Sequence, residues 1–371
     1  MEYDETVYAC AINRVFNFNC RDARMLTDRF SLPGEVFALS ERELRRLLND
    51  DGRYSGVLLD SRTLRAAEEE VAWARSHSIR IIYIRDKDYP SRLRECPDAP
   101  VVLFYKGNCS LNPSRAVAIV GTRRATGYGR RQCVRIVESL ALLKEKPLII
   151  SGLAYGIDIT AHLAALDCGL ETAAVLPTGM DSIYPPPHRG HAVRIAGQGA
   201  LVTDFPKGST PMAVTFLRRN RIIAGMADAV ILVESATRGG GLITARTALS
   251  YSRDVFAVPG RIGDPCSEGC NRLIEANGAA LAASPESIAA SMGWNDTAQE
   301  CRKTRFQKIL EKSDYIQRNI LLTLSADSAV ERNELIRRSG ADPSEVLDRL
   351  TRMELDGIVG SDIFGNCILK I

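Results

Sequence analysis

Between residues 80 and 290, short apolar runs alternate with longer segments of helical pattern. The apolar runs are continuous in Val, Ile, Leu and Ala, which is typical of strands that are buried on both faces. The candidate strands are Arg80–Ile84, Val101–Tyr105, Ala116–Val120, Leu148–Ile150, Thr172–Leu176, Leu201–Thr203, Ala229–Val233 and Val255–Val258. Strands separated by helices in this way predict a mainly parallel sheet with helices on both sides. The expected fold class is therefore α/β, with a Rossmann-like, doubly wound domain over residues 80–290.

Residues 1–75 carry helical rather than strand patterns. Leu44, Leu47 and Leu48 recur at helical spacing, and a charged helix continues over Ala66–Trp73. The pattern predicts a small helical domain of the SAM-like kind. Because the Gly-x-Gly hairpin of related DNA-binding modules is missing, DNA binding is not favoured for this region.

The C-terminal part of the chain has a third pattern. Residues 291–312 are polar and are predicted to be a linker, and residues 313–371 are predicted to be a separate domain. Helices are expected at Tyr315–Leu324, Glu331–Arg338 and Ser344–Leu355, with Ser344 as the N-cap of the third. Residues 357–361 and 366–371 are expected to pair as a hairpin. Three helices and a hairpin form a winged helix.

The third helix of this winged helix is more acidic than basic. It and the residue after it hold Glu345, Asp348, Glu354 and Asp356 against Arg349 and Arg352. A helix that enters the major groove lies among phosphates, which a net negative charge disfavours. The sequence leaves open whether this domain binds DNA or docks a protein.

Composition narrows the class of protein. The chain has 371 residues, of which 45% are hydrophobic and 25% charged, as in soluble globular proteins. No apolar run approaches the ~20 residues of a membrane span, and the acidic N-terminus does not resemble a signal peptide, so a cytoplasmic protein is expected. The ten cysteines and four histidines show no metal-binding spacing, so we expect reduced thiols and neither metal nor cofactor.

The net charge of +3 hides two strongly basic segments. Residues 115–135 contain six arginines and no acidic residue, and residues 205–226 contain Lys207, Arg218, Arg219 and Arg221, again with no acidic residue. Two concentrated basic segments in a nearly neutral chain indicate a local anionic partner.

Three glycine-rich loops follow predicted strands. The first is residues 121–129, with Gly-Thr-Arg-Arg at its start; the second is residues 151–158, and the third is residues 234–245. Each lies at the C-terminal end of a predicted parallel strand, where open α/β sheets bind ligands, and a helix N-terminus after a glycine turn favours an anion. The first loop lacks both the Gly-x-Gly-x-x-Gly pattern and the Gly-Lys-Ser/Thr of a P-loop, so dinucleotide and P-loop nucleotide binding are disfavoured.

Residues 216–225 read Phe-Leu-Arg-Arg-Asn-Arg-Ile-Ile-Ala-Gly. Arginines bind phosphates in a forked geometry, and an aromatic face stacks on unpaired bases. Taken alone, the run fits a nucleic-acid contact as well as it fits the solvated start of a basic helix. Together with the three loops, it favours a binding edge for a single strand.

Ordered motifs carry a resemblance to a known family. In chain order they are Gly121-Thr122-Arg123-Arg124-x-Thr126-x-Tyr128-Gly129, Ser151-Gly152-x-Ala154-x-Gly156-Ile157-Asp158-x-x-Ala161-His162, residues 219–225, Gly241-Leu242-Ile243-Thr244-Ala245, residues 255–260 and Ser267-x-Gly269-x-Asn271-x-Leu273-Ile274. They resemble the DNA-processing protein DprA (Smf) family over about residues 115–285. Ser252 stands where the family usually has glycine, and Gly239-Gly240 replaces the more common Ser-Gly.

The resemblance implies a dimeric protein that binds single-stranded DNA and loads RecA recombinase in natural transformation, without catalysis. By motif, Thr122 and Arg123 would hold phosphates, Phe216 would meet a base, and Arg219, Asn220 and Arg221 would line the pocket, with added charge from Lys207. The expected nucleic-acid-binding residues are Gly121, Thr122, Arg123, Arg124, Ser151, Gly152, Gly156, Lys207, Phe216, Arg219, Asn220, Arg221, Gly240, Gly241 and Thr244. The surfaces that contact RecA or form the dimer are not visible in the sequence.

Two other functions are compatible with parts of the pattern. The sheet and glycine loops are similar to those of nucleotide phosphoribohydrolases, but the third loop lacks that family's glutamate; Glu234 and Asp158 are the acids that remain. A transcription regulator that uses the winged helix would prefer duplex DNA. Assays of base release and of single-strand against duplex binding separate these functions from the first.

Overall fold

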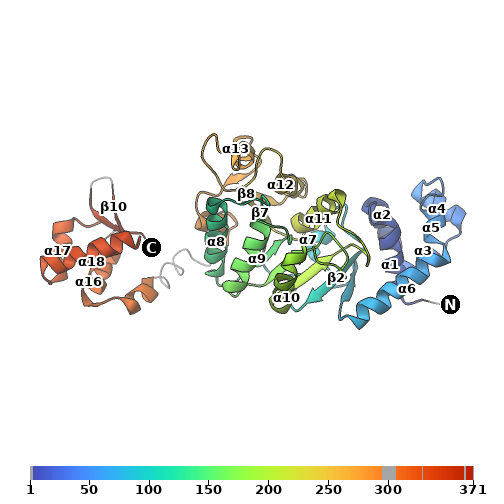
Figure 1. The fold of residues 1–371 in the computed structure, drawn as a ribbon, viewed down its shortest axis with the longest axis horizontal. Coiled ribbons are helices and arrows are strands. Elements are labelled where there is room, and N and C mark those ends of the chain that lie inside the picture. The colour runs from blue at the N-terminus through green and yellow to red at the C-terminus, as the bar shows by residue number, and fades with distance from the viewer. Residues whose placement is uncertain (1–2, 295–305, 328, 363–364, 371) are drawn as a thin grey trace. The chain divides into compact units, whose positions relative to one another are not determined.

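A computed structural model of the chain describes residues 3–294, 306–327, 329–362 and 365–370. The chain divides into two compact units, Met1–Met292 and Gly293–Ile371. Figure 1 shows the helices and strands of each unit. The domain boundaries proposed from the sequence within the first unit stay a prediction.

One nine-stranded sheet forms the centre of the first unit, in the order β1-β2-β6-β5-β4-β3-β7-β8-β9. From β6 to β9 along this order all pairs are parallel, and β2 runs antiparallel to both β1 and β6. The strands are β1 (Arg80–Tyr83), β2 (Val102–Gly107), β3 (Ala116–Val120), β4 (Leu148–Ser151), β5 (Thr172–Val175), β6 (Ala200–Thr203), β7 (Ala229–Leu232), β8 (Asp254–Ala257) and β9 (Ala280–Leu281). The predicted α/β class with a mainly parallel sheet is confirmed; the two-residue β9 was not predicted.

The sheet is buried on both faces, which explains its continuous apolar runs. In β5, Ala173 and Val175 belong to the core formed with α11 and α12, whereas Ala174 belongs to the core formed with α9 and α10. Successive side chains of a strand point to opposite faces, so both positions need apolar residues. The helices of this part are α7 (Ser91–Arg94), α8 (Gly127–Ala141), α9 (Ile157–Asp167), η1 (Pro186–His188), α10 (Arg189–Gln198), α11 (Ala213–Gly225), α12 (Gly240–Ser250), α13 (Glu268–Glu275) and α14 (Pro285–Ser291).

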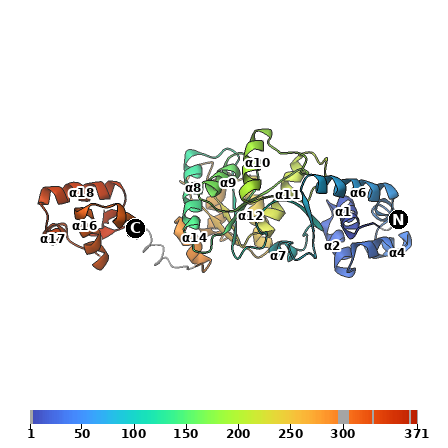
Figure 2. The same ribbon diagram turned by 90° about the horizontal axis from the view of Figure 1, so that it is seen from below.

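The helical N-terminal segment packs on the end of the sheet that carries β1 and β2 (Figure 2). Its helices are α1 (Glu5–Phe16), α2 (Cys20–Arg29), α3 (Pro33–Phe37), α4 (Glu41–Leu48), α5 (Ser55–Leu58) and α6 (Ser61–Ser76). Their apolar faces form a common core with Val102 and Phe104 of β2. Two of these helices contain the leucine pattern and the charged run that predicted a helical region.

The second unit contains three helices and a hairpin: α16 (Tyr315–Ala326), α17 (Arg332–Ser339), α18 (Pro343–Leu355), β10 (Val359–Ser361) and β11 (Cys367–Leu369). This is the predicted winged helix. Its third helix begins one residue earlier than expected because Asp342, not Ser344, is the N-cap: the Asp342 carboxylate accepts a hydrogen bond from Ser344 N at 2.9 Å. Residues 306–312 of the predicted linker are helical, and residues 363–364, between the two expected strands of the hairpin, lie outside the described residues.

Two further observations concern the described residues only. None of their helices combines the length and the apolar character that a bilayer crossing needs. Their cysteines are free thiols, most of them buried, and no group of three or more His, Cys, Asp or Glu side chains among them is arranged to hold a metal ion.

Candidate functional site

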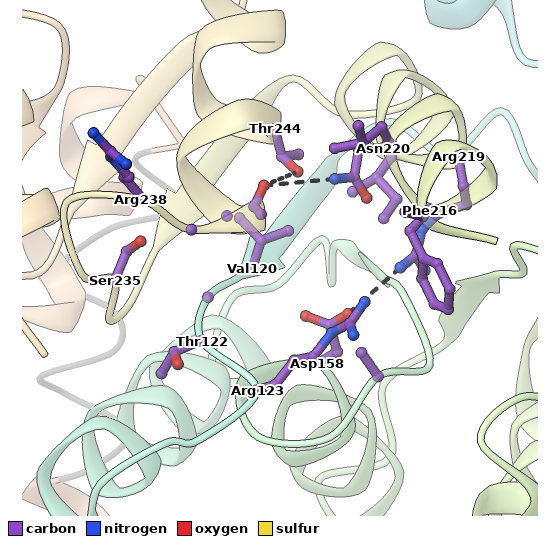
Figure 3. A pocket seen from close by; sticks show the side chains of 18 of the residues that line it. Val120, Thr122, Arg123, Asp158, Phe216, Arg219, Asn220, Ser235, Arg238 and Thr244 are labelled. Atoms are coloured by element: carbon purple, nitrogen blue, oxygen red, sulfur yellow. Dashed lines mark hydrogen bonds and ion pairs between the residues drawn. The ribbon is translucent and has the colours of Figure 1, made fainter.

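The strand order reverses beside β3. The chain adds β4, β5 and β6 on one side of β3 and then returns to add β7 on the other side. Loops diverge at such a point, and open α/β sheets bind ligands there, at the C-terminal ends of the strands. A cavity of about 680 Å³ lies here, lined by the loops after β3 and β7 and by helix α11 (Figure 3).

Most of the predicted binding residues line this cavity. They are Gly121, Thr122, Arg123, Phe216, Arg219, Asn220, Gly240, Gly241 and Thr244. Its lining does not include the other predicted residues, which are Arg124, Ser151, Gly152, Gly156, Lys207 and Arg221. The structure thus brings the first loop, the third loop and α11 together at one edge of the sheet.

Glycines allow the three loops to pack closely. Gly156 has a φ of +78°, and a Cβ there would lie 2.2 Å from the carbonyl oxygen of Thr122. A Cβ on Gly121 would lie 2.9 Å from the carbonyl oxygen of Glu234. The first loop is therefore held between the second and the third. Gly156 shapes the site without lining it.

Hydrogen bonds between Thr126 and Glu234 hold the first loop in place. The Thr126 hydroxyl accepts a hydrogen bond from Gly129 N at 3.1 Å and caps α8, while it donates to the Glu234 carboxylate at 2.6 Å. The same carboxylate accepts from Thr126 N at 2.8 Å. Glu234 is buried and occupied by these contacts, which makes it a structural residue rather than a free acid or base.

Phe216 forms an aromatic platform on α11 at the mouth of the cavity. Its ring is half-buried and meets Tyr184 edge-on, with 5.4 Å between centroids and an interplanar angle of 71°. The Arg123 guanidinium lies over the Phe216 ring, 4.6 Å from its centroid. A planar cation, which can bind a phosphate, and an aromatic ring, which can stack on a base, thus lie next to each other.

Arg219 lies at the back of the cavity with its charge largely committed to the protein. It is 3% exposed, donates to Val175 O at 2.6 Å and lies 3.9 Å from the Asp158 carboxylate. Burial lowers the pKa of Arg219 to about 10 and raises the pKa of Asp158 above its ordinary value. A Cβ on Gly152 would lie 1.9 Å from Arg219 Nη1, so this glycine makes room for the guanidinium.

A buried histidine supports the Gly152 turn. His162 Nε2 donates to Gly152 O, which can only accept. On the other side of the ring, Nδ1 lies 2.6 Å from the Thr172 hydroxyl oxygen, which is also within hydrogen-bond distance of Ile149 O at 2.9 Å. Burial lowers the pKa of His162 to about 4. The nearby Ser151 hydroxyl is also buried and donates to Ile119 O at 2.6 Å. Through these buried hydrogen bonds, both side chains help to fix the conformation of the second loop.

Arg221 points away from the cavity. Its guanidinium forms an ion pair with the buried Asp204 and donates to the Asp98 carbonyl oxygen. The contact with Asp204 ties α11 to the loop after β6, and the contact with Asp98 ties it to the segment before β2. Two other predicted residues also lie elsewhere: Lys207 places its ammonium 5.1 Å from the Trp73 ring centroid, and Arg124 is exposed at the outer side of the first loop.

Polar groups of the third loop close the other side of the cavity. Gly240 O accepts from Thr244 Oγ1 at 3.2 Å and from Asn220 Nδ2 at 3.5 Å, which fixes the start of α12 against α11. Figure 3 shows Ser235 and Arg238 on this side, opposite Arg123 and Phe216. Arg238 is exposed and forms no ion pair with any described residue.

Several lining residues were not among the binding residues predicted from the sequence, and three of them have polar side chains that suit a nucleic-acid ligand. Tyr184 and Arg238 line the cavity, as does Ser235. Arg238 lies in the third glycine loop, so its positive charge close to the end of a predicted strand could have indicated it as an anion-binding residue. Tyr184 follows β5 and precedes three prolines, and an aromatic residue after a strand of the same sheet edge was a second signal.

Comparison with known proteins adds an independent result. A family model described as DNA recombination-mediator protein A matches residues 80–293, and one described as DprA winged helix domain matches residues 308–361. The chain is similar to Protein Smf of Escherichia coli, with 35% identity over 302 residues that cover 80% of this chain and 79% of the relative.

Two solved structures are also similar. The X-ray structure of DNA processing protein A (DprA) from Streptococcus pneumoniae has 31% identity and a TM-score of 0.66, covering 78% of this chain and 98% of that one. A structure of DNA processing protein A from Helicobacter pylori, which addresses the single-stranded DNA binding mode of that protein, has 28% identity and a TM-score of 0.52. It covers 58% of this chain and 95% of that one.

Proposed function

We infer that this chain, which belongs to the DNA recombination-mediator protein A (DprA/Smf) family, binds single-stranded DNA and delivers it to a recombinase. In this proposal the protein protects incoming single strands and loads RecA onto them during natural transformation. It carries out no chemical step on the DNA. The related protein from Helicobacter pylori is described as binding single-stranded DNA, which supports the same ligand here.

One observation supports the proposal most directly: Phe216 and Arg123 stand together at the mouth of the cavity between the glycine loops. An aromatic ring accepts any unpaired base by stacking, and an exposed arginine binds phosphate. The backbone of Gly121 and Thr122 lies in the same lining and allows close approach of the sugar-phosphate chain. In a duplex the bases are stacked inside, so the Phe216 ring favours a single strand.

The burial of each arginine decides its proposed role. Arg123 and Arg238 are exposed in the lining, so these two contact phosphates. Arg219 contributes a partly neutralised positive field from the back of the cavity. Arg221 acts by holding α11 in place through Asp204, because its guanidinium is turned away from the cavity.

Binding of oligo-dT and of a duplex of the same length tests this function. We expect the wild type to prefer the single strand and Arg123→Ala to bind it more weakly, with the slope of log K against log salt reduced by about 0.7 for one lost phosphate contact. Arg135→Ala is the matched control, because Arg135 is an exposed arginine on α8 outside the cavity. A duplex preference of the wild type, or equal salt slopes for Arg123→Ala and Arg135→Ala, would contradict the proposal.

RecA loading and self-association are separate parts of the proposal. A pull-down of RecA in the presence of oligo-dT, and sedimentation of the free protein, test them. We expect RecA to be retained and the protein to sediment as a dimer. An assay of base release from nucleoside monophosphates tests the alternative enzyme, and we expect no release above a blank, since Glu234 is held by Thr126.

A further inference from the structure

We propose that the opposite face of α11 carries a second nucleotide-binding site, built from Phe18 and Arg218, onto which a single strand continues from the main cavity. This inference rests on the proposed function. Phe18 lies in the turn between α1 and α2 and is 54% exposed, which is unusual for a phenylalanine in a folded chain. The Arg218 guanidinium lies over its ring, 4.6 Å from the centroid. The pair repeats the arrangement of Arg123 over Phe216, also at 4.6 Å.

A separate cavity of about 200 Å³ lies beside this pair. Phe18, Cys20, Arg21 and Arg218 contribute to its lining. Arg218 donates to Cys20 Sγ at 3.1 Å, and its buried Nε has no acceptor. A thiol is a weak acceptor, so the guanidinium retains most of its capacity to bind an oxygen anion.

The charge of this second site is positive, because its carboxylates compensate only part of the charge of its arginines. Arg221 also lines it, but Asp204 neutralises that guanidinium. Asp98 also lines the site, and its carboxylate, which accepts a hydrogen bond from the Tyr251 hydroxyl, carries one negative charge against Arg218 and Arg21. Among the described residues, Arg218 and Arg21 form no ion pair with a carboxylate. Two cations and one exposed ring are therefore available to a ligand, and they match a phosphate and a base.

The path between the two sites crosses a single helix. Successive helical residues are turned by about 100°, so Phe216 and Arg218 lie on nearly opposite sides of α11. Leu217 lies between them, lines the main cavity and is 47% exposed, and Val214 one turn earlier is 44% exposed. A helix with its side chains is about 10–12 Å across, a span that a few nucleotides cover. The exposed apolar ridge offers contact for the bases that cross it.

The combination favours a nucleic-acid strand over a protein partner. An acidic peptide would match the two arginines but would not need a planar ring beneath a guanidinium. Bases stack on both groups, on aromatic rings and on arginine planes alike. The second site would extend the length of strand that one molecule holds.

The test is the affinity for oligo-dT of increasing length, with Phe18→Ala and Arg218→Ala. Leu32→Ala and Arg53→Ala are matched controls: Leu32 is 52% exposed in the same helical segment, and Arg53 lies over the Tyr54 ring at 5.4 Å. For strands of about 4 nucleotides we expect all four variants to bind as the wild type does. For strands of about 16 nucleotides we expect Phe18→Ala and Arg218→Ala to raise the Kd at least about fivefold, the lower end of one stacked base.

The outcomes separate this inference from the proposed function. If the wild type fails to bind oligo-dT of any length, the proposed function is wrong. If the wild type binds and Arg123→Ala weakens binding, but Phe18→Ala and Arg218→Ala match their controls at every length, only the second site is wrong. If Phe18→Ala and Arg218→Ala lose affinity equally for short and long oligo-dT, the effect lies in the main cavity, and the second site is again wrong.

Phe18→Trp gives a direct readout. The chain has two native tryptophans, so the difference between Phe18→Trp and wild-type fluorescence isolates the new ring. We expect long oligo-dT to quench this difference signal and short oligo-dT to leave it unchanged. If long oligo-dT is bound but leaves this fluorescence difference unchanged, the second site is wrong.

Discussion

Neighbouring arginines on helix α11 have different surroundings, and these surroundings decide what each can bind. Arg219 and Arg221 are buried against carbonyl oxygens and carboxylates, whereas Arg218 is half-buried and lies over the exposed ring of Phe18. A buried guanidinium that already donates to the protein has little left for a phosphate. The binding charge of the main cavity is therefore assigned to Arg123 and Arg238, which are exposed in its lining.

Replacing Arg221 by Ala should lower the free energy of unfolding by about 3–5 kcal/mol, because it leaves the carboxylate of Asp204 buried and unpaired. Asp204 is 1% exposed. The double change Arg221→Met with Asp204→Leu should recover much of this loss, since neither charge remains. Urea denaturation measures both variants. A stable Arg221→Ala protein that has lost oligo-dT binding would instead place Arg221 in contact with the strand.

His162 should make stability fall in mild acid. Burial lowers the pKa of His162 to about 4, against 6.5 for a free imidazole. Between these two pH values the unfolded chain binds the proton and the folded chain does not. The full contribution of about 3 kcal/mol is present above pH ~6.5 and is lost as the pH falls towards 4.

The ring resonances of His162 measure this prediction. They should show no titration above about pH 5. His162→Asn should reduce the loss of stability, measured by urea denaturation, between neutral pH and pH ~4.5. A His162 titration near its ordinary value would contradict the arrangement with Gly152 and Thr172.

At this scale the sequence predicted residue types better than side-chain directions. Phe216, Arg123 and Asn220 line the cavity as expected, because they lie in motifs next to strand ends and on α11. Arg221 was expected beside them, yet its guanidinium faces the other way. A one-residue step on a helix turns a side chain by about 100°, and a run of arginines does not reveal which side has the carboxylate.

At the scale of elements, the loops and strands of the sheet were predictable because burial on both faces leaves a continuous apolar run. The strand ends agree to within two residues, and the glycine loops follow as expected. The edge strand β9 was missed because its residues, Ala280 and Leu281, are only two and are exposed. The N-cap of α18 was misplaced because Asp342 and Ser344 both suit that position.

The contact between the first two loops depends on one glycine. In Gly156→Ala, the new Cβ would meet the Thr122 carbonyl oxygen, and the positive φ would add strain. We expect a loss of about 1–3 kcal/mol or more in the free energy of unfolding and weaker oligo-dT binding, because the first loop is displaced.

Gly169→Ala separates the effect of the positive φ from the effect of the close Cβ contact. Gly169 has a φ of +67° but nothing within 4 Å of a new Cβ. This variant should show the backbone cost alone and retain oligo-dT affinity. Urea denaturation and an affinity titration compare the two variants. Equal behaviour in both assays would mean that loop packing at Gly156 does not shape the site.

At the scale of the whole molecule, loops at one edge of the sheet line the main cavity, and the winged helix is a second compact unit with a different charge pattern. Arg349 and Arg352 of α18 are both paired, with Asp314 at 2.7 Å and with Asp348 at 3.3 Å. This helix therefore presents little free positive charge for a major groove. The architecture was predictable because each region has its own periodicity, whereas the placement of one unit against another has no such signal in a single sequence.

In the proposed binding mode, an unpaired base stacks on Phe216 while arginines of the loops bind its phosphates. The most direct test is the Kd of Phe216→Ala for oligo-dT at fixed salt. We predict an increase of about 5- to 150-fold, equivalent to about 1–3 kcal/mol for one stacked base, with the salt slope unchanged because no phosphate contact is lost. An unchanged Kd in a folded Phe216→Ala protein would contradict this binding mode.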